Sequence, residues 1–95
     1  MKLVSLKPAN NNIHKYVAIV EKEDGSRRTI RFGAKGMSDF TLHGDEARKQ
    51  RYLDRHRPRE DWNDPLTPGF WSRWYLWNLP TKRESLADLR SRFDL

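Results

Sequence analysis

Hydrophobic and polar positions alternate with a period of two along residues 15–32, KYVAIVEKEDGSRRTIRF. This period is typical of β-strands, whose successive side chains point to opposite faces of a sheet. Asp24-Gly25 favours a tight turn in the middle of the stretch, because both residues tolerate a positive φ. In the returning strand, apolar residues alternate with Arg27 and Arg31. The pattern therefore predicts a β-hairpin with one apolar face and one cationic face.

Two shorter stretches of the first half also predict extended structure. Residues 2–7 (KLVSLK) are largely apolar and end before a proline, and residues 40–42 (FTL) follow the loop GAKGMSD at 33–39. The glycines of this loop favour a turn between strands, because it lacks the Gly-Lys-Ser/Thr ending of a phosphate-binding loop. Lys35 and the free amides around it nevertheless remain candidates to contact a single phosphate group.

The pattern changes to helical in residues 44–95. Residues 44–57 (GDEARKQRYLDRHR) begin with acidic and end with basic side chains, an order that suits the helix dipole, and Pro58 stops the segment. Thr67 and Pro68 fit the N-cap and first position of a second helix, which reaches about residue 77. This second helix is apolar almost all round, so either its own domain or a partner must cover it.

A third helix begins after Thr81, which has the capping-box spacing to Glu84. Its apolar stripe consists of Leu86, Leu89 and Phe93. The chain thus predicts one α+β domain over residues 1–95. Its β-rich part, 1–43, forms a small antiparallel sheet made of the hairpin plus one or two short strands. Its helical part, 44–95, contributes three short helices.

The aromatic residues gather in residues 59–80, REDWNDPLTPGFWSRWYLWNLP, which hold all four tryptophans. A chain of this length has few apolar side chains to bury, so we expect at least two of the four tryptophans in the core. Specifically, Phe70, Trp74, Leu86 and Leu89 are predicted to be buried together. Aromatic side chains left at the surface would stack on bases or anchor a protein partner. The candidates for core or anchor are Trp62, Phe70, Trp71, Trp74 and Trp77.

Nineteen Lys and Arg against thirteen Asp and Glu give a formal net charge of +6, which favours acidic partners. Arginine suits carboxylate and phosphate, because its planar guanidinium donates two hydrogen bonds at once. For the helical arginines, local ion pairs with Glu46, Asp54 and Glu60 are an equally open alternative. The candidate contacts to an acidic partner or to phosphate are Arg27, Arg31, Lys35, Arg48, Arg51, Arg55 and Arg57.

Candidate chemistry is sparse. The chain has no cysteine, and its three histidines show no metal-ligand spacing. His56, Glu60, Asp61 and Asp64 are the residue types of a Mg²⁺-dependent nuclease, but such carboxylates are also ordinary turn and capping residues. Because their spacing specifies no reaction, we predict a protein that is not an enzyme, without catalytic residues, cofactor or metal. No apolar run approaches the roughly 20 residues of a membrane span, and the N-terminus does not resemble a signal peptide, so we expect no secretion.

Three motifs carry a resemblance: FGAKG at 32–36 with Ser38-Asp39, RKQRYLDRHRPRE from Arg48, and WNDPLTPGFWSRWYLWN from Trp62. With them, the chain resembles a family of small basic proteins of unknown function from large nucleocytoplasmic DNA viruses, including viruses of algae. The resemblance implies a viral protein that is packaged in the virion or acts near viral DNA in the cytoplasm or nucleus of the host cell. It implies no catalytic or binding residue.

Two functional hypotheses follow. The first is a structural or assembly protein, such as a minor virion or capsid component, that binds other proteins through its aromatic helix and arginines. The alternative is a sequence-independent nucleic-acid-binding protein whose arginines contact the phosphate backbone of DNA or RNA. A nuclease ranks third.

Overall fold

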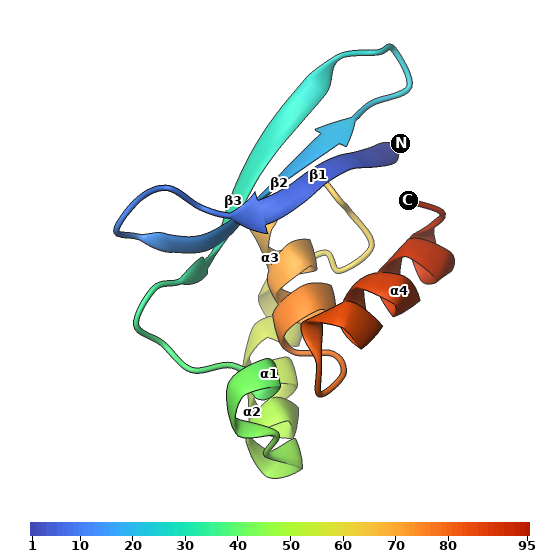
Figure 1. Ribbon diagram of the computed structural model, residues 1–95. Coiled ribbons are helices and arrows are strands. Elements are labelled where there is room, and N and C mark those ends of the chain that lie inside the picture. The colour runs from blue at the N-terminus through green and yellow to red at the C-terminus, as the bar shows by residue number, and fades with distance from the viewer.

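The computed structural model describes all 95 residues, and a three-stranded antiparallel sheet with helices on one face forms its frame (Figure 1). The strands β1 (Lys2–Pro8), β2 (His14–Glu21) and β3 (Arg27–Ala34) follow one another in the order β1-β2-β3. The helical part comprises α1 (Phe40–His43), α2 (Glu46–His56), the 3₁₀ turn η1 (Arg57–Arg59), α3 (Pro68–Trp71), the π-helical turn η2 (Ser72–Leu76) and α4 (Lys82–Phe93). The predicted α+β class is confirmed.

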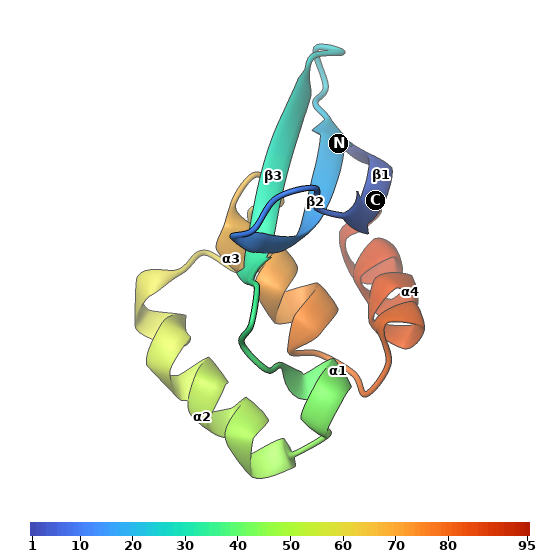
Figure 2. The same ribbon diagram turned by 60° about the vertical axis from the view of Figure 1, so that its left-hand side comes forward.

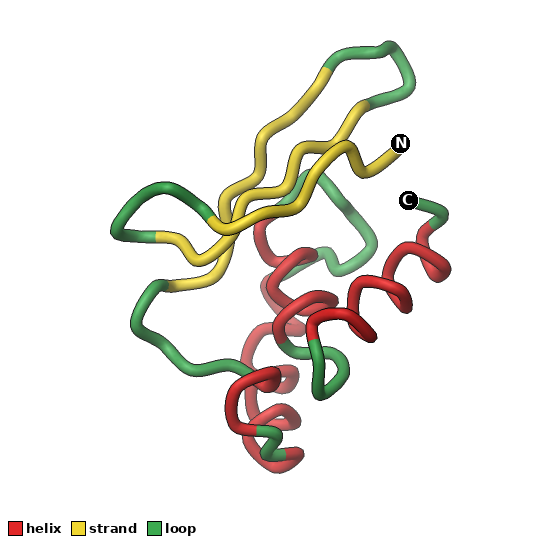
Figure 3. The backbone as a smooth tube through the Cα atoms, viewed as in Figure 1, coloured by secondary structure: helices red, strands yellow, loops and turns green.

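The β2–β3 hairpin has the turn and the two faces that the alternating pattern predicts. Ala18 lies opposite Ile30 and both are buried, whereas their neighbour Arg31 is exposed on the outer face. The turn uses a left-handed Gly25 at φ 85°. Figure 3 shows the strands extending past the helices, so the tip of the hairpin projects without cover. Residues 2–7 form the predicted additional strand, β1, with a β-bulge between Leu3 and Ser5.

Residues 40–42 are not a strand, contrary to the prediction, because they begin the short helix α1. The Asp39 carboxylate caps this helix by accepting a hydrogen bond from the Thr41 backbone N–H at 2.9 Å. Gly44 then ends it in the left-handed conformation, at φ 63°. These local hydrogen bonds outweigh the β-propensity of Phe-Thr-Leu.

The α2 helix begins at Glu46, later than the predicted position 44, because Asp45 acts as its N-cap. The Asp45 carboxylate accepts from the N–H groups of Ala47 and Arg48 at 2.9 and 3.2 Å. At α4 the predicted capping box is present in altered form. Glu84 N–H donates to Thr81 Oγ1 at 3.1 Å, but the Glu84 carboxylate accepts from the Thr81 hydroxyl and not from its backbone.

The aromatic segment is not one regular helix. Thr67 caps α3 as predicted, accepting from Phe70 N–H at 3.3 Å. After Trp71 the helix widens into the π-helical turn η2, where the Trp77 N–H donates to the Ser72 carbonyl, five residues back, at 3.0 Å. Because of this wider turn, the residues after it do not lie on the helix face that a regular period of 3.6 residues per turn predicts for them.

The core lies between the inner face of the sheet and the helices α3, η2 and α4. Phe70 and Leu89 are fully buried there, as predicted. Trp74 and Leu86 are only partly buried and pack against the rim of the core. The prediction that these two residues are buried is therefore wrong. The buried apolar cluster consists of Ala18, Val20, Ile30, Phe32, Phe70, Trp71, Leu76, Leu89 and Leu95.

The α2 helix stands apart from the sheet, reached through α1 on one side and the connector to α3 on the other (Figure 2). Its buried side chains, Tyr52 and Leu53, attach it to the remainder of the helical part. No helix in the structure combines the length and apolar character needed to cross a bilayer.

Candidate functional site

Three arginines and two tryptophans alternate in a row across the helical part, which we call the arginine–tryptophan ladder. The Arg57 guanidinium lies 5.9 Å from the centre of the Trp62 ring, and the Arg73 guanidinium lies 5.5 Å from the same centre. Arg73 is 4.2 Å from the Trp74 ring, and Arg92 is 4.6 Å from that ring. All four separations fall within cation–π range.

Four separate segments supply the ladder, so tertiary structure and not sequence spacing builds it. Arg57 comes from η1, Trp62 from the connector, Arg73 and Trp74 from η2, and Arg92 from α4. The two indoles are fixed relative to each other, because Trp74 Nε1 donates to the Trp62 carbonyl at 2.7 Å. The ladder is therefore a preorganised surface.

Arg73 is the central cation of the ladder and forms no ion pair. Its Nη1 donates to the Trp77 carbonyl at 2.9 Å, but its Nε is buried without a hydrogen-bond partner. Burial, followed by the charge of Arg92, lowers the pKa of this guanidinium below its ordinary value. Arg57 and Arg92 have carboxylate neighbours at 3.7 Å (Asp54) and 3.3 Å (Asp88). The ladder thus has an uncompensated positive charge at its centre.

A second set of cations, Arg48, Arg51 and Arg55, lies along one face of α2. The three side chains are exposed and none forms an ion pair. The carboxylates expected to pair with them are engaged elsewhere or left free. Asp54 contacts Arg57 and accepts from Gln50, Glu60 binds His56 and Trp62, and Glu46 makes no ion pair. The local-ion-pair alternative is therefore not seen for this row.

The cations of the sheet do not join either set. Arg27 and Arg31 point from β3 toward the face turned away from the helices, and Arg27 lies 3.5 Å from Glu21. The Lys35 ammonium donates to the carbonyl of Asn11 at 2.8 Å and so braces the β1–β2 loop. The seven predicted cationic contacts are thus split among β3, the loop after it, α2 and the ladder.

The tryptophans divide between core and surface. Trp71 and its neighbour Phe70 are completely buried, whereas Trp62, Trp74 and Trp77 are half-buried. Trp62 and Trp74 form the ladder. Trp77 lies flat against Tyr52, with ring centres 4.3 Å apart, and Tyr52 stacks in turn on His56 at 4.2 Å.

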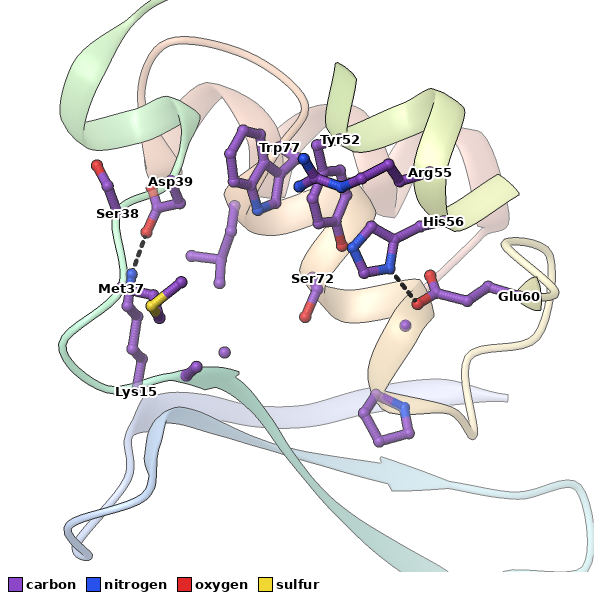
Figure 4. Close-up of a pocket in the computed structure, with 15 residues that line it drawn as sticks. Lys15, Met37, Ser38, Asp39, Tyr52, Arg55, His56, Glu60, Ser72 and Trp77 are labelled. Atoms are coloured by element: carbon purple, nitrogen blue, oxygen red, sulfur yellow. Dashed lines mark hydrogen bonds and ion pairs between the residues drawn. The ribbon is translucent and has the colours of Figure 1, made fainter. Parts of the chain in front are cut away.

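A cleft of about 380 Å³ opens on the side of this ring stack that faces the sheet (Figure 4). One wall carries Tyr52, Arg55 and His56 from α2. The opposite wall is the loop between β3 and α1, including Met37. Burial raises the pKa of the Tyr52 hydroxyl well above its ordinary value, so this group stays protonated.

A hydrogen-bonded acid–base pair stands at each end of the cleft. His56 Nδ1 lies 3.0 Å from Glu60 Oε1, and Lys15 Nζ lies 2.7 Å from Asp39 Oδ2. Asp39 is 1% exposed, so its pairing with Lys15 offsets the cost of burying a carboxylate. Nowhere do three or more His, Asp or Glu side chains gather in a group that could hold a metal ion.

Sequence reasoning missed several of these residues. Arg73 and Arg92 carried no signal, because the ladder joins distant segments. His56 and Glu60 were noticed as residue types, and their spacing of four within a helical stretch was the available clue to their contact. Lys15 and Asp39 are 24 positions apart, so no local pattern could pair them.

Comparison with known proteins gives a family but no function. Residues 4–56 match the model of a family described as "Family of unknown function (DUF5754)". The match includes most of β1, all of β2, β3, α1 and α2, and more than half of the chain. No curated protein and no solved structure matches the chain. The chain belongs to this family of unknown function.

Proposed function

We propose that the protein is a non-enzymatic binding protein that docks on an acidic segment of a protein partner through the arginine–tryptophan ladder. The observation that carries this proposal is Arg73, a half-buried guanidinium held between two indoles without a carboxylate. A carboxylate from a partner would supply the missing counterion in a partly dry environment, where charge-assisted hydrogen bonds are strong. Arginine and tryptophan are also the residues most enriched among binding hot spots.

The charge around the ladder favours a protein over a nucleic-acid backbone. Asp54 and Asp88 lie next to its outer arginines, so positive and negative groups alternate at its edge. A carboxylate on a flexible peptide side chain can reach Arg73 without approaching these carboxylates, whereas the regularly spaced phosphates of a nucleic-acid backbone would come close to them.

The resemblance to proteins of large DNA viruses extends the proposal to the setting. In a virion, a small preformed domain with an acid-binding face would connect larger components as a minor structural protein. The acidic segment would then belong to another virion protein.

A binding assay with an acidic polypeptide tests the ladder. Poly-L-glutamate labelled with fluorescein should bind, and Arg73→Met should weaken binding about tenfold by removing a charge-assisted hydrogen bond. Arg48→Met removes an exposed arginine outside the ladder and serves as the matched control. Equal losses in both variants would mean that net charge alone drives binding, and the ladder would lose its assigned role.

A second candidate function rests on the unpaired row of Arg48, Arg51 and Arg55. Their exposure without ion pairs suits the phosphate backbone of DNA or RNA. If they bind duplex DNA, log affinity should fall with log salt at a slope of about −0.9 per neutralised phosphate. An Arg51/Arg55 double alanine variant should flatten that slope. Tight DNA binding at physiological salt, lost in this variant, would place nucleic-acid binding first.

A further inference from the structure

His56 presents a hydrogen-bond acceptor to the cleft. Its Nδ1 lies 3.0 Å from Glu60 Oε1, and a carboxylate can only accept, so Nδ1 carries the hydrogen of the neutral ring. Nε2 therefore holds the lone pair, and it makes no hydrogen bond within the protein. Figure 4 shows the imidazole pointing from α2 into the cleft, with its bond to Glu60 drawn dashed.

The orientation of His56 is fixed from two directions. The second oxygen of Glu60, Oε2, accepts from Trp62 Nε1 at 2.7 Å, so the carboxylate cannot rotate away from the imidazole. The ring itself stacks on Tyr52 at 4.2 Å. An acceptor held this firmly recognises a donor in one position without a further loss of rotamer freedom.

Arg55 places a free positive charge on the same wall of the cleft. Its guanidinium forms no ion pair, and Figure 4 shows it beside the rings of Tyr52 and Trp77. A cation next to a fixed acceptor suits a ligand that has an anionic group and a hydroxyl on neighbouring atoms.

The opposite wall offers apolar surface on a braced loop. Met37 is 66% exposed, although methionine is normally buried, and it faces the cleft. The loop is held at Asp39, which binds Lys15 at 2.7 Å and caps α1. A cavity of about 380 Å³ lies in the usual range of small-molecule sites.

We infer that this cleft binds a ribonucleotide, with Arg55 on the phosphate, His56 Nε2 accepting from the adjacent ribose hydroxyl, and the base against Met37. A ribonucleoside 3′-phosphate combines the three features that the cleft complements: an oxyanion, a vicinal hydroxyl and a flat apolar body. The site is separate from the ladder and does not depend on docking to an acidic partner. Free ribonucleoside 3′-phosphates and RNA chains that end in a 3′-phosphate share this chemistry.

The test is a titration of the intact protein with adenosine 3′-monophosphate, followed by NMR and calorimetry. Binding should weaken about tenfold with Arg55→Ala, as expected for a charge-assisted contact, and stay unchanged with Arg83→Ala, which removes an exposed arginine outside the cleft, the ladder and the α2 row. The 2′-deoxy nucleotide should bind several-fold more weakly, because it lacks the donor to His56. A short single-stranded RNA with a 3′-phosphate forms a second arm. Tighter binding of this RNA than of the mononucleotide identifies an RNA end as the source, and equal binding identifies the free nucleotide.

Glu60 is a positioning residue, and Glu60→Gln tests its role separately. The glutamine amide can donate to Nδ1, so the hydrogen of the ring should move to Nε2, a change that long-range ¹H–¹⁵N spectra of the imidazole report. The preference for the ribonucleotide over its deoxy counterpart should then disappear. His56→Phe keeps a ring to stack on Tyr52 and should have the same effect on the preference.

Three results would overturn the inference. One is the absence of any shift in the cleft residues at millimolar nucleotide. Another is an equal loss of affinity in Arg55→Ala and Arg83→Ala, which would indicate non-specific attraction. The third is an undiminished preference for the ribonucleotide in His56→Phe. None of them bears on poly-L-glutamate binding at the ladder, so the two proposals fail independently.

Discussion

The phenol ring of Tyr52 lies flat on the indole of Trp77, with centres 4.3 Å apart and planes 2° from parallel. This contact joins α2 to the chain that leaves η2. A hydrogen bond from Lys49 Nζ to the Asn78 carbonyl, at 2.6 Å, runs alongside it. Because α2 stands apart from the sheet (Figure 2), these side chains help to determine where the wall of the cleft stands.

Removal of the Tyr52 ring should therefore loosen α2. Tyr52 is 7% exposed, and Tyr52→Ala should lower the free energy of unfolding by about 3 kcal/mol, as for other buried aromatic truncations. Tyr52→Phe keeps the stack and should cost much less. Urea unfolding measures both, and an unchanged midpoint in Tyr52→Ala would show that the stack does not hold the helix.

Two tryptophans in the same segment should differ in their contribution to stability. Trp71 is 0% exposed and its Nε1 donates to the Pro65 carbonyl at 2.8 Å, so Trp71→Ala should cost about 3–5 kcal/mol. Trp74 is half-buried at the rim, and Trp74→Ala should cost distinctly less. Thermal unfolding of the two variants gives the comparison. A larger loss for Trp74 would contradict the placement of the core.

Substitutions at Gly33 and Gly36 should distinguish the cost of backbone strain from the cost of steric crowding. Both have a positive φ, 75° at Gly33 and 89° at Gly36, so alanine should cost about 1–2 kcal/mol at either position. At Gly33 a new Cβ would lie 2.9 Å from Leu76 Cδ1, whereas at Gly36 nothing lies within 4 Å. Gly33→Ala should thus lose about 1 kcal/mol or more beyond Gly36→Ala, owing to overpacking. Denaturant midpoints test the order, and equal losses would argue against the close approach of β3 to η2.

Acid should weaken the start of α2 through Asp45. The hydrogen bond from the Arg48 backbone N–H, together with that from Ala47, holds the pKa of this carboxyl below its ordinary 3.8. A pKa that is lower in the folded state gives stability above the ordinary value, and that stability is lost as the pH falls through the folded pKa. Asp45→Asn retains the cap and should remove this part of the acid dependence. Unfolding midpoints from pH 6 to roughly pH 2 measure it, and parallel curves for both proteins would contradict the assignment.

Local patterns predicted the elements better than their contacts. The hairpin followed from its alternation and Asp24-Gly25, and Thr67 and Thr81 identified two helix starts. The strand predicted at residues 40–42 failed, because the Asp39 cap that turns them into helix α1 acts through geometry that composition does not reveal. Helix boundaries shifted for the same reason at Asp45.

Some residues of the site could be predicted from the sequence, but their arrangement could not. Arg57, Trp62 and Trp74 were candidates for a binding surface, but the arginine between the two indoles was not among them. A row built from four segments depends on how η1, η2 and α4 come together, and no periodicity within one segment specifies that. The same holds for the cleft, whose walls come from β3, the loop after it, α2, α3 and η2.

The wide turn η2 acts as a phase shift within the aromatic segment. Before it, Trp71 packs toward Phe32 of the sheet, with ring centres 6.1 Å apart, and after it Trp77 turns to Tyr52 of α2. A π-helical turn holds one residue more than an α-helical turn, and one residue corresponds to a rotation of about 100°. If Ser72–Leu76 were wound as a regular α-helix instead, every later side chain would be rotated by about that angle. One inserted position thus lets a short helix serve two differently oriented neighbours.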